Sequence, residues 1–436
     1  MSRSKYLSII VTCTLCILSC IACLPADAQT PDAIYSDNIK TPQLYPKGNQ
    51  LAYPVLPLNS SDKLELHFDD LDGDVKNYSY TFQLCNADWT PALVSEFDYI
   101  KGFSQVRIDN YQYSSVSLTQ YTHYQAVIPD PNCIPIRSGN YLLKVFLDGD
   151  TAKLAFTRRF LVTNAKVTIH SQMLQPMDFA LSHTHQRIQF KFNTSEINPA
   201  NPLDQIKVVV LQNYRWDNAM RDLRPTFYVG NSLEYNDENV CVFPGGREWR
   251  WLDLQSSFRF QSDRVQTANY GKNSTEIFMK PDGDRSTQNY TFYKDYNGYF
   301  FIQTTESLNP FYQTDYARVR FSYIPPGNTP YPDKDIYILG QFNGGLIGGA
   351  LNDSTKMVFN AEKGRYELSF LLKQGYYSYS YVTIDRNDPD RKAAFDFTEG
   401  NHSETENDYT ILVYYRAPGA RADELVGINR FSSLSK

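Results

Sequence analysis

The acidic side chains of residues 396–408 are the densest group in the sequence that could do chemistry. This stretch holds five carboxylates and one histidine, and in it Glu399 and Glu404 could act as a general acid and base pair while His402 could bind a metal ion. One histidine is too few for a zinc site, and acidic loops that join strands are common on protein surfaces. The pattern therefore favours a structured loop that docks a partner through Glu399 and Glu404 over a catalytic site.

A second acidic group surrounds Gly73. Asp69, Asp70, Asp72 and Asp74 could offer oxygen ligands to Ca²⁺, which prefers such donors. The sequence lacks the glutamate that ends a twelve-residue calcium-binding loop. A polar hairpin turn is the favoured interpretation.

Two histidines have the spacing of a shared metal site. His183 and His185 would face the same side of a strand, but no cysteine or third histidine lies nearby, which favours an ordinary exposed strand. The sequence also lacks a Gly-x-Ser-x-Gly elbow, a Gly-x-x-x-x-Gly-Lys phosphate loop and a His-Glu-x-x-His helix. We therefore expect no enzymatic activity, no catalytic residues, no cofactor and no metal ion.

Three cysteines follow the first 28 residues. Cys85 and Cys133 lie in one predicted domain, so an oxidising compartment could join them in a disulfide bond, and Cys241 would stay unpaired. The alternative is three buried thiols, and the sequence leaves both open.

Aromatic side chains are the remaining candidates for recognition. Trp249 and Trp251 share one face of their segment, and an outward-facing pair would make a strong interface anchor, since tryptophan dominates binding hot spots. The tyrosines of residues 376–381 are a further candidate docking surface.

The elements that must position these residues are β-strands. Tyr, Phe and Trp make up 14% of the chain, and short runs alternate apolar and polar residues, as in half-buried strands. Turn sequences rich in Gly, Asn and Asp separate the runs. We predict an all-β fold of tandem immunoglobulin-like β-sandwich domains. The predicted divisions are an N-terminal sandwich over residues 29–164, a second β-rich domain over 165–324, a proline-rich linker over 325–332, a C-terminal sandwich over 333–427 and a tail over 428–436.

The predicted C-terminal sandwich resembles the early-set immunoglobulin-like domains that include glycogen-binding modules. Those modules usually carry an aromatic pair at the place where this chain has Gly344 and Gly345. The departure weakens the argument for sugar binding in this segment.

The first 28 residues have the pattern of a secretory signal peptide. Arg3 and Lys5 precede an apolar run, and Ala28 ends a small-residue cleavage site. Cys20 offers the alternative of a lipoprotein signal. We expect an exported protein, and the net charge of −6 argues against a nucleic-acid partner.

Several motifs, taken in their order and spacing, resemble one known family, the plug protein of the type IX secretion system of Bacteroidetes. They are Phe68-Asp69-Asp70-Leu71, Tyr78-Ser79-Tyr80, Cys85-Asn86-Ala87-Asp88-Trp89, Ser138-Gly139-Asn140-Tyr141, Pro244-Gly245-Gly246-Arg247-Glu248-Trp249-Arg250, Asp396-Phe397-Thr398-Glu399-Gly400-Asn401, Glu404-Thr405-Glu406-Asn407-Asp408-Tyr409 and Val413-Tyr414-Tyr415-Arg416.

The resemblance implies a non-enzymatic periplasmic protein associated with the outer membrane. Such a protein binds a large outer-membrane β-barrel translocon, its expected partner, and closes the periplasmic opening of that barrel. It is peripheral to the outer membrane, with which it associates through this partner. The alternative is a carbohydrate-binding or lipoprotein accessory of an outer-membrane glycan-uptake system, based on the glycogen-module resemblance and on Cys20.

Overall fold

The structure, a computed structural model, describes residues 32–256, 262–272, 274–344 and 351–435. Residues 31–436 form one compact unit. The predicted signal peptide, with Ala28 and Cys20, lies outside the described residues. The described residues contain no helix long and apolar enough to cross a bilayer.

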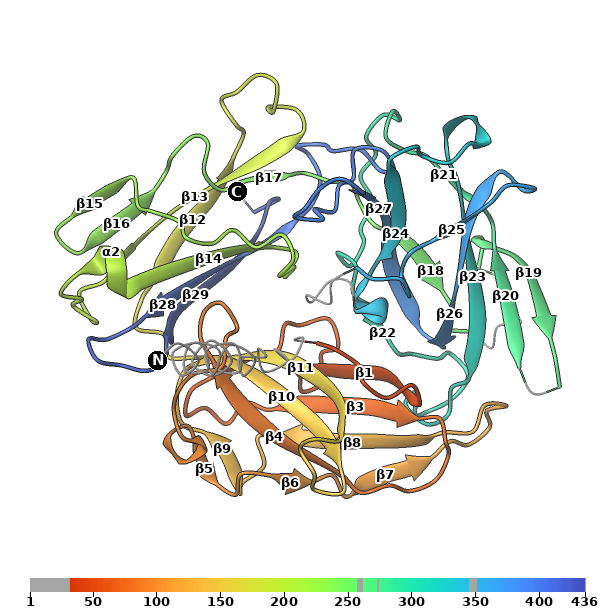
Figure 1. The fold of residues 1–436 in the computed structure, drawn as a ribbon, viewed down its shortest axis with the longest axis horizontal. Coiled ribbons are helices and arrows are strands. Elements are labelled where there is room, and N and C mark those ends of the chain that lie inside the picture. Colours follow the sequence, from red (N-terminus) through yellow and green to blue (C-terminus); the bar gives the residue numbers. More distant parts are fainter. Residues whose placement is uncertain (1–31, 257–261, 273, 345–350, 436) are drawn as a thin grey trace, which may run out of the picture. The chain divides into compact units, whose positions relative to one another are not determined.

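Residues 32–164 form the N-terminal sandwich, in which two sheets enclose one apolar core (Figure 1). Leu64, Leu66 and Phe68 alternate along one strand and point into this core, as the period-2 pattern predicts. One sheet has the order β1 (Ile39–Pro46), β3 (Leu64–Asp70), β8 (Thr122–Ile128), β7 (Asn110–Tyr113), and the other the order β2 (Val55–Pro57), β11 (Leu154–Thr163), β10 (Gly139–Leu147), β4 (Tyr78–Cys85), β6 (Val106–Arg107). The short strands β5 (Ile100–Gly102) and β9 (Cys133–Pro135) pair separately, after the 3-10 turn η1 (Glu96–Asp98).

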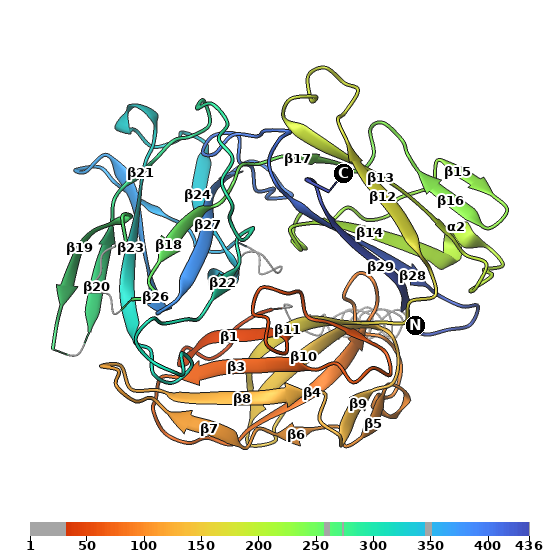
Figure 2. The ribbon, with the colours of Figure 1, turned by 180° about the vertical axis from the view of Figure 1, so that it is seen from behind.

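The middle sandwich combines residues that are far apart in the sequence. Its first sheet holds β12 (Ile169–Leu174), β13 (His185–Asn193), β16 (Ser232–Tyr235), β15 (Phe227–Val229) and β17 (Val242–Pro244). Its second sheet has the order β14 (Ile206–Gln212), β28 (Asp408–Tyr415), β29 (Glu424–Ser432), and the helical turn α2 (Pro202–Gln205) precedes β14. The last two strands of the chain therefore complete the middle sandwich, and Figure 2 shows them beside β14.

The third sandwich is built from the residues between β17 and β28. One sheet is organised around β27 (Tyr376–Asp385), which pairs with β18 (Arg250–Asp253), β22 (Phe300–Phe301) and β24 (Lys334–Leu339). The other holds β19 (Val265–Tyr270), β20 (Thr275–Met279), β23 (Tyr316–Ile324), β26 (Arg365–Lys373), β25 (Val358–Asn360) and β21 (Asp282–Gly283). Two 3-10 turns, η2 (Pro326–Asn328) and η3 (Gln341–Asn343), flank β24.

These pairings confirm tandem β-sandwiches but correct the predicted divisions. The proline-rich segment 325–332 joins β23 to β24 inside the third sandwich and is not a linker between domains. Residues 408–432 do not belong to the last sandwich or to a tail, because β28 and β29 extend the sheet of β14. Local sequence patterns show that a strand exists but not which distant strand it pairs with.

A fourth apolar core is shared by the three sandwiches. Along β14, Val208 and Val210 face the core of the middle sandwich, while Val209 and Leu211 face the shared core. Side chains from the N-terminal and third sandwiches enter the same cluster, including Leu161 and Val382. Strands such as β14 are therefore buried on both faces, whereas the alternating pattern predicts burial on one.

Candidate functional site

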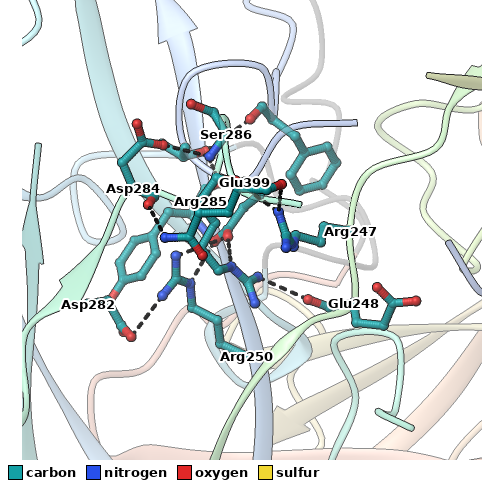
Figure 3. A network of polar contacts seen from close by, with 12 residues as sticks. Arg247, Glu248, Arg250, Asp282, Asp284, Arg285, Ser286 and Glu399 are labelled. Carbon is teal, nitrogen blue, oxygen red and sulfur yellow. Dashed lines mark hydrogen bonds and ion pairs between the residues drawn. The ribbon is translucent and has the colours of Figure 1, made fainter. Parts of the chain in front are cut away.

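The buried carboxylate of Glu399 lies in an ion network inside the third sandwich (Figure 3). Arg250 of β18 donates from Nε and Nη2 to its two oxygens, over 2.9 and 3.0 Å, and Arg285 Nε donates to Oε2 over 2.6 Å. The backbone N–H of Tyr381 donates to Oε1 over 3.1 Å. Burial alone would raise the pKa of Glu399, but the charges of Arg250 and Arg285 lower it to about 2. Glu399 is thus an ionised structural group.

Asp282 of β21 is the second carboxylate of this network. It accepts hydrogen bonds from Arg250 Nη1 over 2.9 Å and from the hydroxyls of Tyr379 and Tyr381 over 2.8 and 2.9 Å, and it also pairs with Arg264. The buried carboxylates of Glu399 and Asp282 are thus matched by guanidinium groups. These ion pairs stabilise the sandwich, and neither carboxylate is a free group for proton transfer.

Two of the four predicted docking residues are buried, which corrects their predicted role. Glu399 is 0% exposed and Trp249 is 3% exposed, so neither side chain can contact a partner. The Trp249 ring packs against the edge of Phe395 in the shared core. Trp251 is half-buried, and Glu404 is exposed. Glu399 and Glu404 therefore do not face one another as an acid and base pair.

The tyrosine run of β27 is also an internal feature. Tyr377, Tyr379 and Tyr381 are fully buried in the core of the third sandwich. Tyr376 is half-buried and stacks on Phe301. The predicted docking surface on this run is therefore wrong, because the strand turns most of its aromatic face inward.

The loop that carries Glu399 packs against the segment that follows β17. The backbone carbonyl of Gly246 accepts hydrogen bonds from the His402 N–H and from Thr405 Oγ1, each over 2.9 Å. A Cβ atom at Gly245 would lie 1.9 Å from the His402 carbonyl oxygen, so only glycine allows this contact. This loop is a junction between the middle and third sandwiches.

The residues weighed as metal ligands in the sequence do not form a vacant cation site. Among the described residues, the group that could hold a metal ion is Asp70, Asp72 and Asp74. The Lys76 ammonium group pairs with all three carboxylates and so occupies the place of a cation. The histidine pair is not part of any such group in the described ranges, and His183 is exposed.

Of the two alternatives for Cys85 and Cys133, a disulfide bond or buried thiols, the structure has the thiols. Cys85, Cys133 and Cys241 are free, buried thiols, and burial raises the pKa of each to about 12. Cys85 belongs to the shared core, whereas Cys133 belongs to the core of the N-terminal sandwich. Their side chains thus pack in different clusters.

A buried ion pair joins the N-terminal and third sandwiches. Asp69 of β3 pairs with Lys373 of β26, and both side chains are 1% exposed. His123 Nδ1 lies 2.6 Å from the other oxygen of Asp69, and the Tyr316 hydroxyl also donates to Asp69. Burial raises the pKa of Asp69, but the Lys373 charge and the His123 contact outweigh this effect and lower it overall. Asp69 is therefore a junction residue, unlike Asp72 of the same acidic group, which lies in the turn after β3.

A second buried carboxylate joins the N-terminal and middle sandwiches. Asp423 accepts hydrogen bonds from the Ala87 N–H and from Lys207 Nζ, both over 3.0 Å, and from Arg416 Nε over 2.7 Å. Arg416 also donates to Asn86 over 2.7 Å. The motif at residues 85–89 and the motif at residues 413–416 thus meet at one buried site.

The exposed apolar side chains are features that the sequence analysis missed. In the N-terminal sandwich, Leu93 and Phe97 are each 81% exposed, and Phe103 is 67% exposed. They lie in one stretch around η1 and β5. Phe179 in the middle sandwich is 84% exposed. No alternating pattern marks these residues, because they lie in turns.

The sequence analysis also missed a cavity of about 440 Å³ that all three sandwiches line. Asp295 lies in its wall, where it accepts hydrogen bonds from the N–H groups of Asn297 and Trp249. Burial raises the pKa of Asp295 to about 7, and the charges of Glu406 and Glu248 add to this effect. The folded protein therefore disfavours the charged form of the Asp295 carboxyl group.

We expect Asp295→Asn to stabilise the protein near pH 8. A raised carboxyl pKa lowers stability progressively as the pH rises from about 4 to about 7, and a pKa difference of one between the folded and unfolded protein is equivalent to about 1.4 kcal/mol. The amide has one acceptor oxygen fewer than the carboxylate, and the loss of that hydrogen bond costs about 1–2 kcal/mol. The variant should therefore gain about 2 kcal/mol in its free energy of unfolding. Urea denaturation of both proteins near pH 8 and pH 4 measures the difference. The gain should disappear at the lower pH, and a gain that does not change with pH would contradict the argument.

Comparison with known proteins identifies the N-terminal part of the chain. Residues 39–164 match the family model described as the type 9 secretion system plug protein first domain. These residues coincide with the strands of the N-terminal sandwich, from β1 to the end of β11. No curated protein matches the chain.

A solved structure has a similar fold over nearly the whole chain. It is the crystal structure of a hypothetical protein from Parabacteroides merdae, with 29% sequence identity and a TM-score of 0.87. The match covers 92% of this chain and 99% of that one. A second structure, trypsin-activated alpha-2-macroglobulin from Escherichia coli, aligns at 9% identity over 90% of this chain and 28% of that one, with a TM-score of only 0.17. Residues 39–164 are thus a first domain of the type 9 secretion system plug protein family.

Proposed function

We propose that this protein is a non-enzymatic periplasmic plug, which binds and closes the periplasmic opening of the large outer-membrane β-barrel translocon of the type IX secretion system. The observation that carries the proposal is the match of residues 39–164 to the first domain of the plug family. The family supports a role in this secretion system and a place next to the outer membrane.

The rigidity of the described unit supports this role. A plug must keep its shape against the mouth of a pore, and here three sandwiches share one apolar core. The buried Asp69–Lys373 ion pair joins the N-terminal and third sandwiches, and Asp423 of the middle sandwich accepts a hydrogen bond from the Ala87 N–H of the N-terminal one. Relative movement would leave Asp69 without its charged partner. The charged groups at the junctions thus have a mechanical role that needs no catalytic residue.

The exposed apolar residues of the matched domain are the docking surface that we propose. Leu93, Phe97 and Phe103 project from one stretch of the N-terminal sandwich, where apolar side chains would gain from contact with a partner. A reversible plug needs an interface of moderate size, and a few large apolar side chains suit that need. Glu404 and Trp251 remain proposed docking residues on other parts of the surface.

Affinity purification from the native cell envelope tests the function. The tagged protein should recover a very large outer-membrane β-barrel protein. Recovery of glycan-uptake components in place of such a barrel would overturn the proposal. The buried tyrosines of β27 leave the glycan-uptake alternative without support from exposed aromatic residues on that strand.

A pair of matched variants tests the docking surface. Phe97→Asp should lower recovery of the barrel about tenfold or more, because a central apolar contact at an interface is worth about 2 kcal/mol. Phe179→Asp is the control, since Phe179 has a similar exposure, 84% against 81%, but lies outside residues 39–164. Equal recovery with both variants would exclude Phe97 from the interface.

A further inference from the structure

The cavity at the shared core has the size of a ligand site and is lined by aromatic and acidic side chains. Its volume of about 440 Å³ falls in the range of small-ligand pockets. The N-terminal sandwich contributes Leu51 and Tyr53 to its walls. The third sandwich contributes Phe292, Lys294, Asp295, Tyr296, Asn297, Tyr299 and Glu406, and the middle sandwich contributes Asp408, Arg430, Ser432 and Leu434.

Three buried polar atoms of the cavity wall have no hydrogen-bond partner among the described residues. They are the hydroxyls of Tyr53 and Tyr299, residues that are 6% and 3% exposed, and Oδ1 of Asn297, which is 8% exposed. A buried polar atom without a partner costs about 1–3 kcal/mol, so such atoms in a cavity wall indicate a missing ligand or water. Oδ1 of Asn297 can only accept a hydrogen bond, so the group missing beside it is a donor, whereas a tyrosine hydroxyl can accept from such a donor or donate.

The charges around the cavity are unbalanced. Asp408 pairs with Arg430, whose guanidinium group also lies 3.9 Å from the centre of the Tyr53 ring. Asp295 and Glu406 form no ion pair with any described residue. Their hydrogen bonds come from neutral donors, which for Glu406 are Asn297 Nδ2 and Ser432 Oγ, each over 3.0 Å. The wall therefore has two carboxylates without an ion-pair partner, and with the exposed Lys294 beside them its charged side chains carry one negative charge in excess.

The chemistry of the wall selects one kind of side chain. A guanidinium group offers five N–H donors in one plane, can pair with two carboxylates and stacks on aromatic rings such as that of Tyr296. Phe292 and Leu434 are 53% and 54% exposed and could contact apolar parts of a longer ligand. We propose that the cavity binds an arginine side chain carried by a peptide segment of a partner protein. This site stands apart from the exposed surface around Phe97 and does not require the plug function.

Titration of the purified protein with a short peptide tests the proposal. The probe is acetyl-Ala-Arg-Ala-amide, and its control is the same peptide with citrulline, which has the shape of arginine without its charge. Calorimetry or NMR titration near pH 8 should show that the arginine peptide binds at least about tenfold more tightly, a difference of about 1.4 kcal/mol. Equal affinities, or no binding of the arginine peptide at millimolar concentration, would overturn the proposal.

Variants of the wall locate the binding site. Glu406→Gln and Asp295→Asn should each remove most of the preference for arginine over citrulline, while Glu404→Gln, at an exposed position outside the cavity, should keep it. Unchanged preference in both cavity variants would exclude this site. Agmatine, which carries the guanidinium group without a peptide, should bind more weakly than the peptide. Equal or tighter binding of agmatine would overturn the assignment to a peptide.

Discussion

Replacement of Glu399 by glutamine should lower the free energy of unfolding by about 3–5 kcal/mol, the usual cost of removing one partner from a buried ion pair. The change leaves Arg250 and Arg285, 5% and 13% exposed at their side chains, without the carboxylate that both contact. The side chain keeps its size, so the loss comes from charge and hydrogen bonding and not from a cavity. Chemical denaturation near pH 7 measures the effect.

Glu404→Gln is the matched control, because Glu404 lies in the same loop but is exposed. We expect it to change the free energy of unfolding by less than about 0.5 kcal/mol. The difference between the two variants should also depend on pH. The lowered pKa of Glu399 gives stability that is present above about pH 4.5 and is lost as the pH falls toward 2. Equal stability of the two variants near pH 7 would show that the network contributes little.

Replacement of Lys373 by methionine should cost a similar amount, about 3–5 kcal/mol, at the junction between the N-terminal and third sandwiches. Methionine fills much of the space of the lysine stem but leaves Asp69 as a buried carboxylate without its cation. The charge would lie among His123, Tyr316 and the ring of Tyr121. Burial lowers the pKa of His123 to about 4, so its ring is neutral near pH 7 and does not take the place of the ammonium group there. Chemical denaturation combined with limited proteolysis measures both the stability and the opening of this junction.

Two further variants make this result specific. Lys363→Met removes an exposed lysine that pairs with Glu367, so it should change stability by less than about 1 kcal/mol. Adding Asp69→Asn to Lys373→Met should recover part of the lost stability, because the double variant has neither charge of the ion pair and so no unmatched buried carboxylate. A double variant no more stable than Lys373→Met would show that the loss arises from packing and not from charge.

The individual strands could be predicted from the sequence, but their partners could not. The alternation of Leu64, Leu66 and Phe68 identifies β3 correctly because the period of two is local. The pairing of Val209 in β14 with Leu412 in β28 is a contact across most of the second half of the chain, and no local pattern predicts it. The predicted domain boundaries were therefore wrong where the distant strand β28 completes the sheet of β14.

The prediction of Glu399 as an exposed docking residue was wrong for a related reason. An acidic loop with Glu399 has the composition of a surface loop, and its burial depends on Arg250, which lies 149 residues earlier. In the sequence, the available signal is Arg250, which stands between Trp249 and Trp251. A charged residue in this position is as compatible with a buried ion pair as with an exposed one, so it does not show by itself that Glu399 is buried. Motifs that carry the family resemblance lie at junctions, as the contacts of Gly246 and Arg416 show.

The completion of the middle sandwich by β28 and β29 has a consequence for biosynthesis. A ribosome makes β14 long before its partner β28, since Ile206 pairs with Tyr415. During that interval the edge of β14 has unpaired N–H and C=O groups and two apolar faces, a combination that promotes aggregation. A chaperone that holds the nascent chain in an extended form, or export before folding, would protect this edge. The last strands of the polypeptide thus determine when the whole unit can reach its native state.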